Sequence, residues 1–174
     1  MQTRIRHATI NDRDSILTIN RSALNGVSEM DNAYYDLLVA ESAIFHVIEV
    51  NEEIVGYVCA LAHEAAYDGE EFLWFRKHIT GNFLYIDQLA ISKPYRYKGL
   101  GKKLYSDLEK FSTQMNITTL VCDVNYKPFN TESQAFHRRL GFVELDRIPT
   151  RDMVVSLLAK KLIIKRKRKL STAS

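Results

Sequence analysis

The chain has 174 residues, of which 46% are hydrophobic and 26% are charged, with a formal net charge of +3. This length suits one domain with a sizeable core. The composition excludes an intrinsically disordered chain, a collagen-like repeat and a disulfide-stapled miniprotein. The apolar stretches are too short for a transmembrane helix, and the first residues lack the apolar region of a secretory signal. We therefore expect a cytoplasmic protein.

Hydrophobic periodicity, turn residues and capping residues divide the chain into strands and helices. In chain order, we expect a strand at 5–9, a helix capped by Asn11, a short helix at 33–40, strands at 43–50, 54–61 and 83–91, a helix after Gly101, a strand at 118–124, a helix from Thr131 to Leu140, and strands at 142–148 and 153–158. The segment at 62–82 is polar and aromatic by turns, and we expect an insertion loop there. This order predicts an α+β fold around a largely antiparallel sheet, with one parallel strand pair connected through the long helix.

Charge is distributed unevenly along the chain. From Lys160 onward there are seven basic and no acidic residues, which leaves a net charge of −4 on residues 1–159. We expect a single domain at 1–159 and a disordered basic tail at 160–174, because like charges at 165–169 repel one another. The tail is a plain solubilising segment, a contact for anionic membranes or RNA, or a nuclear signal. The mildly acidic domain gives no argument for nucleic-acid binding.

The cysteines and histidines show no pattern typical of a metal site. Cys59 and Cys122 lie in apolar, strand-like segments, and we expect both to be buried free thiols. The five histidines lack the spacing of zinc ligands, so the sequence predicts no metal.

The segment from Leu84 to Tyr105 carries the clearest chemical signal. A strand leads into a turn with two glycines and then into a helix. The amide groups of such a turn and of the first helical residues form an anion-binding cradle of the size of a phosphate. Nearby basic residues add positive charge, although a plain turn would also require glycine. The pattern is neither a P-loop nor a dinucleotide-binding fingerprint.

Two motifs resemble those of one known family. Arg96-x-x-Gly99-x-Gly101 matches the R/Q-x-x-G-x-G/A signature of the GCN5-related N-acetyltransferases (GNAT), and the segment from Asn130 to Phe142 resembles their N-x-x-A-x-x-F-Y-x-x-x-G-F segment. The loop before Asn130 and the Phe-His pair are similar to a little-characterised bacterial branch. The resemblance covers nearly all of the expected domain and implies the GNAT fold, with a parallel strand pair that splays apart.

The resemblance implies acetyl-CoA as co-substrate, held in the cleft between the strands at 83–91 and 118–124. Backbone groups of one strand would pair with the pantetheine arm, the glycine turn would hold the pyrophosphate, and two side chains would line the arm from the other side. The residues implied in these three roles are, in order, Leu89, Ala90 and Ile91; Arg96, Tyr97, Lys98, Gly99, Leu100, Gly101 and Lys102; and Asn130 and Phe136. Phe136 could equally well be a core residue.

The resemblance also implies direct attack of an amine on the thioester, without a covalent enzyme intermediate. His137 occupies the position of the family's tyrosine and is either the acid for the leaving thiolate or a polar helix residue that hydrogen-bonds the cofactor or Ser133, one turn earlier. Asp87 is a base, an anchor for a cationic acceptor, or a structural hydrogen-bond partner of a loop. Strand alternation places Asp87 on one face with Tyr85 and Leu89, opposite Ala90.

Three classes of function follow from these patterns. The first is an acetyltransferase acting on a primary amine of a small molecule or a protein. The second is a non-catalytic coenzyme A-binding sensor or interaction module, for which the replacement of tyrosine by His137 is the argument. The third is a nucleic-acid- or ribosome-associated protein that binds through its tail. The acceptor and the oligomeric state, monomer or homodimer, are left open.

Overall fold

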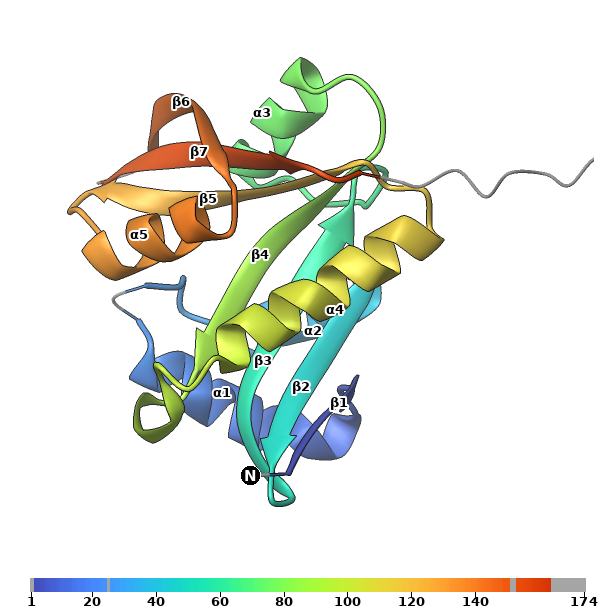
Figure 1. The fold of residues 1–174 in the computed structure, drawn as a ribbon, viewed down its shortest axis with the longest axis vertical. Coiled ribbons are helices and arrows are strands. Elements are labelled where there is room, and N and C mark those ends of the chain that lie inside the picture. The colour runs from blue at the N-terminus through green and yellow to red at the C-terminus, as the bar shows by residue number, and fades with distance from the viewer. Residues whose placement is uncertain (1, 25, 151–152, 164–174) are drawn as a thin grey trace, which may run out of the picture.

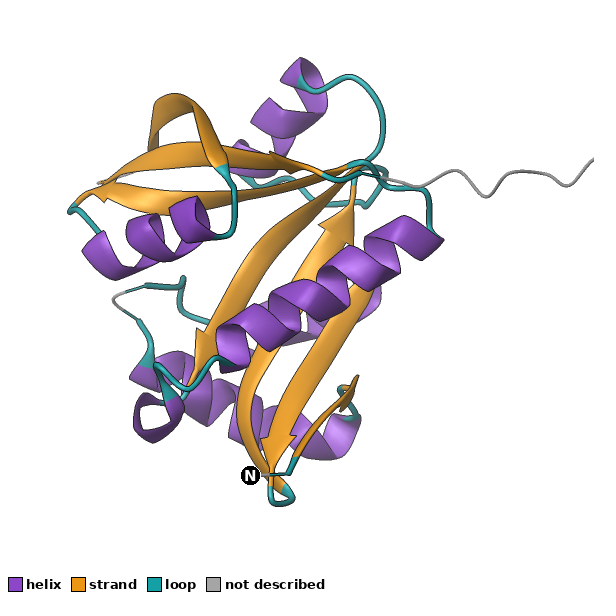
Figure 2. Ribbon diagram, viewed as in Figure 1, coloured by secondary structure: helices purple, strands orange, loops and turns teal. Residues whose placement is uncertain are grey.

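The computed structural model describes residues 2–24, 26–150 and 153–163, and these form one mixed sheet flanked by helices (Figures 1 and 2). The elements follow the predicted order closely. They are β1 (Thr3–His7), α1 (Arg13–Ser22), α2 (Asn32–Glu41), β2 (Ile44–Val50), β3 (Glu53–Ala62), α3 (Glu70–His78), β4 (Phe83–Ile91), α4 (Leu100–Gln114), β5 (Thr119–Lys127), α5 (Thr131–Arg139), β6 (Val143–Thr150) and β7 (Met153–Lys161). Short 3-10 helices lie at Ile10–Asp12 and Lys93–Tyr95.

Within the described residues the strands form a seven-stranded sheet in the order β1-β2-β3-β4-β5-β7-β6. Neighbouring strands are antiparallel except β4 and β5, which are parallel and connected through α4. Their pairing covers three residue pairs, from Phe83 with Thr119 to Tyr85 with Val121. Beyond these pairs β4 and β5 diverge, and the sheet opens into a V (Figure 1). The α+β fold and its splayed parallel pair are thus confirmed.

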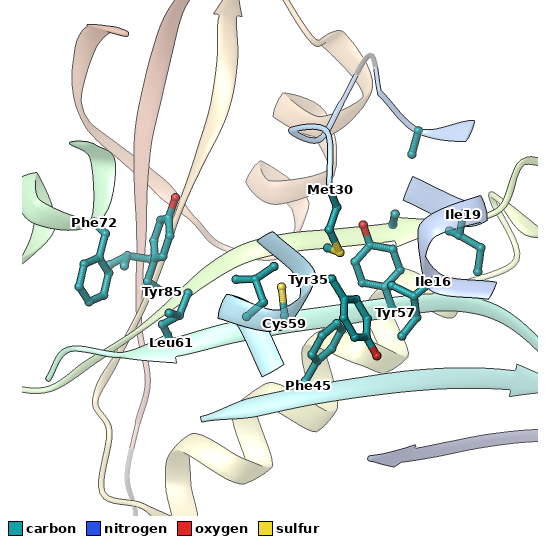
Figure 3. Packing of buried hydrophobic residues seen from close by; sticks show 14 of the residues in the cluster. Ile16, Ile19, Met30, Tyr35, Phe45, Tyr57, Cys59, Leu61, Phe72 and Tyr85 are labelled. Atoms are coloured by element: carbon teal, nitrogen blue, oxygen red, sulfur yellow. The ribbon is translucent and has the colours of Figure 1, made fainter. Parts of the chain in front are cut away.

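Two hydrophobic clusters cover the two faces of the sheet. Residues of α1, α2 and α3, among them Ile16, Leu38 and Phe75, pack on one face with Tyr57 and Tyr85. Figure 3 shows part of this cluster, with Met30 and Tyr57 close together above β3. Residues of α4 and Phe142, which follows α5, pack on the other face against β2, β3, β4 and β5. The two predicted free thiols are confirmed, since each cysteine is buried, one in each cluster.

The predicted cap of the first helix is wrong, because Asp12 and not Asn11 directly precedes α1, and Asn11 lies in the preceding 3-10 helix. Apolar spacing and a capping side chain explain the two helices next to the V. In α4, Leu104 and Leu108 are buried and Phe111 is partly buried, as expected for one apolar face, whereas Met115 follows the helix and is exposed. The side chain of Asn130 caps α5 by accepting a hydrogen bond of 3.0 Å from the amide of Ser133.

The expected insertion loop at 62–82 is wrong, because it contains the helix α3. Phe72 and Phe75, three residues apart, point to the same side and are fully buried. Acidic residues occupy the first turn of α3 and basic residues the last, which favours the helix electrostatically.

The last strand ends later than predicted. β7 runs to Lys161, with Lys160 paired to Leu120 and Lys161 paired to Thr119. The ammonium group of Lys160 also lies 2.6 Å from the carboxylate of Glu109 on α4. The predicted boundary after residue 159 therefore cuts through a strand, and the first two residues of the predicted tail belong to the sheet. The basic run at 165–169 lies outside the described residues.

Candidate functional site

The turn between β4 and α4 forms the end of the V at which anionic groups can bind. Gly99 has a φ of +78° and directly precedes α4. The first amide to bond back into the helix is that of Lys103, which donates to the carbonyl of Gly99 at 3.1 Å. The amides of Leu100, Gly101 and Lys102 come before it and have no acceptor within the helix. Three such donors beside the positive end of a helix suit a phosphate group.

Side chains of the turn form one hydrogen bond to the end of β4 and one to α5. The guanidinium of Arg96 donates to the carbonyl of Ile91 at 3.0 Å. The hydroxyl of Tyr97 donates to the carboxylate of Glu132 on α5. A Cβ on Gly101 would lie only 3.2 Å from the ring of Phe136. The structure therefore brings the predicted turn residues and Phe136 together.

Asn130 lies on the β5 side of the V, directly before α5. Its side-chain oxygen is occupied by the capping bond to Ser133, and its amide nitrogen lies 3.3 Å from the place of a Cβ on Gly26. The loop between α1 and α2 thus approaches the loop between β5 and α5.

A β-bulge in β4 changes which residues face which side. Cys59 pairs with Gln88 and Ala60 pairs with Ile86, so Asp87 between them has no partner on β3. After the bulge Gln88 and Ala90 share the face of Tyr85, whereas Leu89 and Ile91 face α4. The predicted alternation, with Leu89 on the face of Asp87 and Ala90 on the opposite face, is therefore wrong beyond Asp87.

A buried polar network ties the loop after α1 to the bulged strand. The side-chain amide of Asn20 donates to the carbonyl of Ser28 at 3.0 Å and to Gln88 at 2.9 Å. Gln88 donates to the same carbonyl at 2.9 Å and accepts from the hydroxyl of Tyr57 at 2.7 Å. Because the groups of this network satisfy one another, it fixes the loop beside the V.

Asp87 lies next to this network and is bonded to two tyrosines. Its carboxylate accepts from Tyr34 at 2.7 Å and from Tyr67 at 2.8 Å. Tyr34 belongs to α2, and Tyr67 lies between β3 and α3. Burial raises the pKa of Asp87, the two hydroxyls lower it, and nearby Glu71 raises it. The net shift is upward.

Asp123 is a second carboxyl group of the site, and the sequence analysis missed it. It lies on β5 two residues after Val121, as Asp87 lies two residues after Tyr85 on β4. Its carboxylate accepts from the hydroxyl of Tyr85 at 2.7 Å. Burial, with Glu71 and Asp87 nearby, raises its pKa to about 7. An aspartate inside an apolar strand, aligned with Asp87 across the expected parallel pair, was the available signal.

His137 is buried between α4 and α5, among the rings of Tyr105, Phe136 and Phe142. Its Nδ1 lies 2.8 Å from the carbonyl of Ser133, which can only accept, so Nδ1 carries the hydrogen. Its Nε2 then accepts from the hydroxyl of Tyr105 at 2.6 Å. Burial lowers the pKa of His137. Both ring nitrogens are thus already bonded within the protein.

Two further properties of the described ranges bear on the site. No group of three or more His, Cys, Asp and Glu side chains in them is arranged to hold a metal ion. In the same ranges, no helix has the length and apolar character needed to cross a membrane.

Comparisons with known proteins agree with this geometry. Ard1 from Thermoplasma volcanium superposes with a TM-score of 0.75 at 17% identity, covering 94% of this chain and 99% of the other. YncA from Salmonella typhimurium, solved with its cofactor acetyl-CoA, gives 0.69 at 20% identity, with 98% and 99% covered. NAA60 from Arabidopsis thaliana in complex with acetyl-CoA gives 0.71 at 16% identity, with 92% and 100% covered. At such identities these likenesses show the fold.

A search of the curated proteins found no match. The comparison with protein families gives one, which spans residues 14–142 and is described as the acetyltransferase (GNAT) family. This span contains β4, the glycine turn, the carboxyl groups of Asp87 and Asp123, and α5. By this match over most of its length, the chain belongs to the acetyltransferase (GNAT) family.

Proposed function

We propose that the protein transfers the acetyl group of acetyl-CoA to a primary amine, by direct attack of the amine in a ternary complex. The observation that carries this proposal is the V between β4 and β5, which has an anion-binding turn at one end and two partly buried carboxyl groups, Asp87 and Asp123, at its apex. Two of the similar structures, yncA and NAA60, contain acetyl-CoA, which supports the choice of co-substrate.

The backbone of β4 supports the predicted cofactor contacts. On one side its residues pair with β3, and on the other side the pairing with β5 ends at Tyr85. Backbone groups of Leu89, Ala90 and Ile91 that point toward β5 would bond the amides of a pantetheine arm, and at Ile91 the arm would share the carbonyl that accepts from Arg96. The turn from Arg96 to Lys102 would hold the pyrophosphate, and Asn130 and Phe136 would line the arm.

The two carboxyl groups, Asp87 and Asp123, would act on the acceptor amine. An amine is protonated at neutral pH and must lose a proton before it can attack a carbonyl carbon. Asp123, with a pKa of about 7, is suited to accept that proton under these conditions. Asp87, as a base or as an anchor for the cationic amine, is the second candidate. An amide of the diverging strand edge can polarise the thioester carbonyl.

His137 is the candidate acid for the departing thiolate. In this arrangement its Nε2 accepts a hydrogen bond from Tyr105, so it must first gain a proton there. This geometry favours the other interpretation of His137, a polar helix residue that is hydrogen-bonded to Ser133 one turn earlier. It is also the observation in favour of a second function, a coenzyme A-binding module without catalysis.

Two further points of the proposal concern location and partners. Two buried free thiols suit a reducing compartment, and we infer a cytoplasmic location. The basic run at 165–169 would contact anionic membranes or RNA weakly.

Calorimetric titration with acetyl-CoA tests the binding function, and thiol release in the presence of a panel of primary amines and peptides tests transfer. We expect saturable binding and amine-dependent release of coenzyme A. Binding without release for every amine would favour the binding module. The absence of binding would contradict both functions.

A further inference from the structure

We call the side chains of Tyr34, Tyr67 and Asp87 the acceptor wall, since the acceptor amine would bind beside them under the proposed function. Their oxygen-bearing groups form a closed ring. The hydroxyl of Tyr34 lies 2.7 Å from Oδ2 of Asp87, and the hydroxyl of Tyr67 lies 2.8 Å from Oδ1. The two hydroxyl oxygens lie 2.8 Å from each other. All three separations are hydrogen-bond distances, so the ring has three contacts that each require a hydrogen.

The number of hydrogens in the ring depends on the charge of Asp87. Each tyrosine supplies one hydrogen, and an ionised carboxylate supplies none. If both hydroxyls donate to the carboxylate, the contact between Tyr34 and Tyr67 joins two oxygens with no hydrogen between them. A protonated carboxyl supplies the third hydrogen. Tyr34 then donates to Asp87, Asp87 donates to Tyr67, and Tyr67 donates to Tyr34.

The surroundings of Asp87 shift its pKa upward, in the direction that the ring requires. Burial raises its pKa, and the one charged residue among the causes of its shift is the acidic Glu71, which raises it further. The hydroxyl donors act in the opposite direction but leave the net shift upward. The titratable groups that face Asp87 are Tyr34 on α2, Tyr67, Glu71 on α3, Tyr57 and Cys59 on β3, Tyr85 on β4 and Asp123 on β5.

We propose that Asp87 carries a proton in the resting protein and forms, with Tyr34 and Tyr67, a neutral unit that positions the acceptor wall. Asp123 is then the carboxylate that takes the proton of the acceptor amine. This assignment rests on the proposed function and divides the roles of its two carboxyl groups. Asp87 and the two tyrosines are positioning residues, because the ring joins α2 and the segment before α3 to the bulge of β4.

The proton balance of the transfer follows from this division. The ammonium form of the acceptor gives one proton to Asp123. The nitrogen of the acceptor amine then forms a bond to the acetyl carbon, and the bond between that carbon and the sulfur of coenzyme A breaks. The second proton of the nitrogen neutralises the thiolate, and Asp123 returns its proton to water. The proton on Asp87 stays in the ring throughout.

Infrared spectroscopy of the free protein at neutral pH tests the protonation state without any ligand. The difference between wild type and Asp87→Asn should show the carbonyl stretching band of a protonated carboxylic acid, and Asp123→Asn should retain that band. Tyr67→Phe should shift it, because the ring loses a member. Tyr95→Phe, which removes an exposed hydroxyl bonded to Glu53, is the matched control and should leave it in place. Carboxylate bands in the first difference spectrum would overturn the proposal.

Kinetics with the best amine of the panel test the division of roles. An asparagine at 87 can still accept from Tyr34 and donate to Tyr67, so Asp87→Asn should lower the rate by less than about tenfold and keep the rise of the pH–rate profile near pH 7. Asp123→Asn should lose that rise and about 10²–10⁴-fold in rate. The reverse pattern would make Asp87 the base and refute the assignment. Failure of wild type to bind acetyl-CoA would contradict the proposed function and leave the infrared result to decide the ring.

Discussion

At the scale of single residues, Asp123 lies in an apolar strand with Tyr85 as its hydrogen-bond donor, and its pKa is raised from 3.8 to about 7. The folded protein therefore binds a proton at Asp123 at pH values where the unfolded chain has lost it. The free energy of unfolding falls as the pH rises from about 4 to about 7, and the full shift corresponds to as much as roughly 4 kcal/mol.

We expect Asp123→Asn to remove much of this decline, because an amide does not titrate. Urea denaturation at several pH values between about 4 and 8 measures the effect. Asp146→Asn, on the exposed strand β6, is the control and should retain the wild-type slope. Equal slopes in wild type and Asp123→Asn would show that Asp123 ionises normally.

His137 allows a second prediction at this scale. His137→Ala leaves a cavity among aromatic rings and removes the acceptor of the buried Tyr105 hydroxyl, so we expect a loss of about 2–4 kcal/mol in urea denaturation. Arg138→Ala, an exposed neighbour, should change stability little. His137→Gln separates structure from chemistry: a lower kcat at unchanged acetyl-CoA affinity would support the acid role, and an unchanged kcat would rule it out.

At the scale of elements, the turn before α4 combines a left-handed residue with free amides. Gly99→Val strains the backbone and places two methyl groups beside those amides, so we expect acetyl-CoA affinity to fall by at least tenfold in calorimetry. Gly81→Val is a matched control, since Gly81 also has a positive φ, +89°, and open space around it. Comparable melting temperatures but different affinities would support the cradle, and equal affinities would contradict it.

The sequence allowed the prediction of most elements because their apolar spacing is strong, as in α4. It did not allow the prediction of α3, because only Phe72 and Phe75 of its nine residues are buried. Two apolar positions are too few to show a helical repeat. The bulge at Asp87 was not predictable either, because it depends on the register with β3. The tyrosines around Asp87 come from segments 20 and 53 residues away, so only the folded chain brings them together.

At the scale of the whole molecule, the end of β7 joins the last described residues to the sheet and to α4. Truncation after Ala159 removes two paired residues and the ion pair of Lys160 with Glu109, so we expect a lower melting temperature. Truncation after Ile163 retains these contacts and should melt like the full chain. Both truncations should reduce retention on heparin, because both remove the basic run. Equal melting temperatures for the two truncations would show that the end of β7 contributes nothing.

The short parallel pairing of β4 with β5 has a consequence for the protein as a whole. Three residue pairs join one part of the sheet, β1–β4, to the other, β5–β7. Under the proposed function, acetyl-CoA would bond the open edge of β4 and contact α5, and so join the two parts for as long as it stays bound. Because the ligand would bind the folded protein and not the unfolded chain, it would raise the free energy of unfolding with the logarithm of its concentration above Kd. The stability of this protein would thereby depend on the concentration of a metabolite.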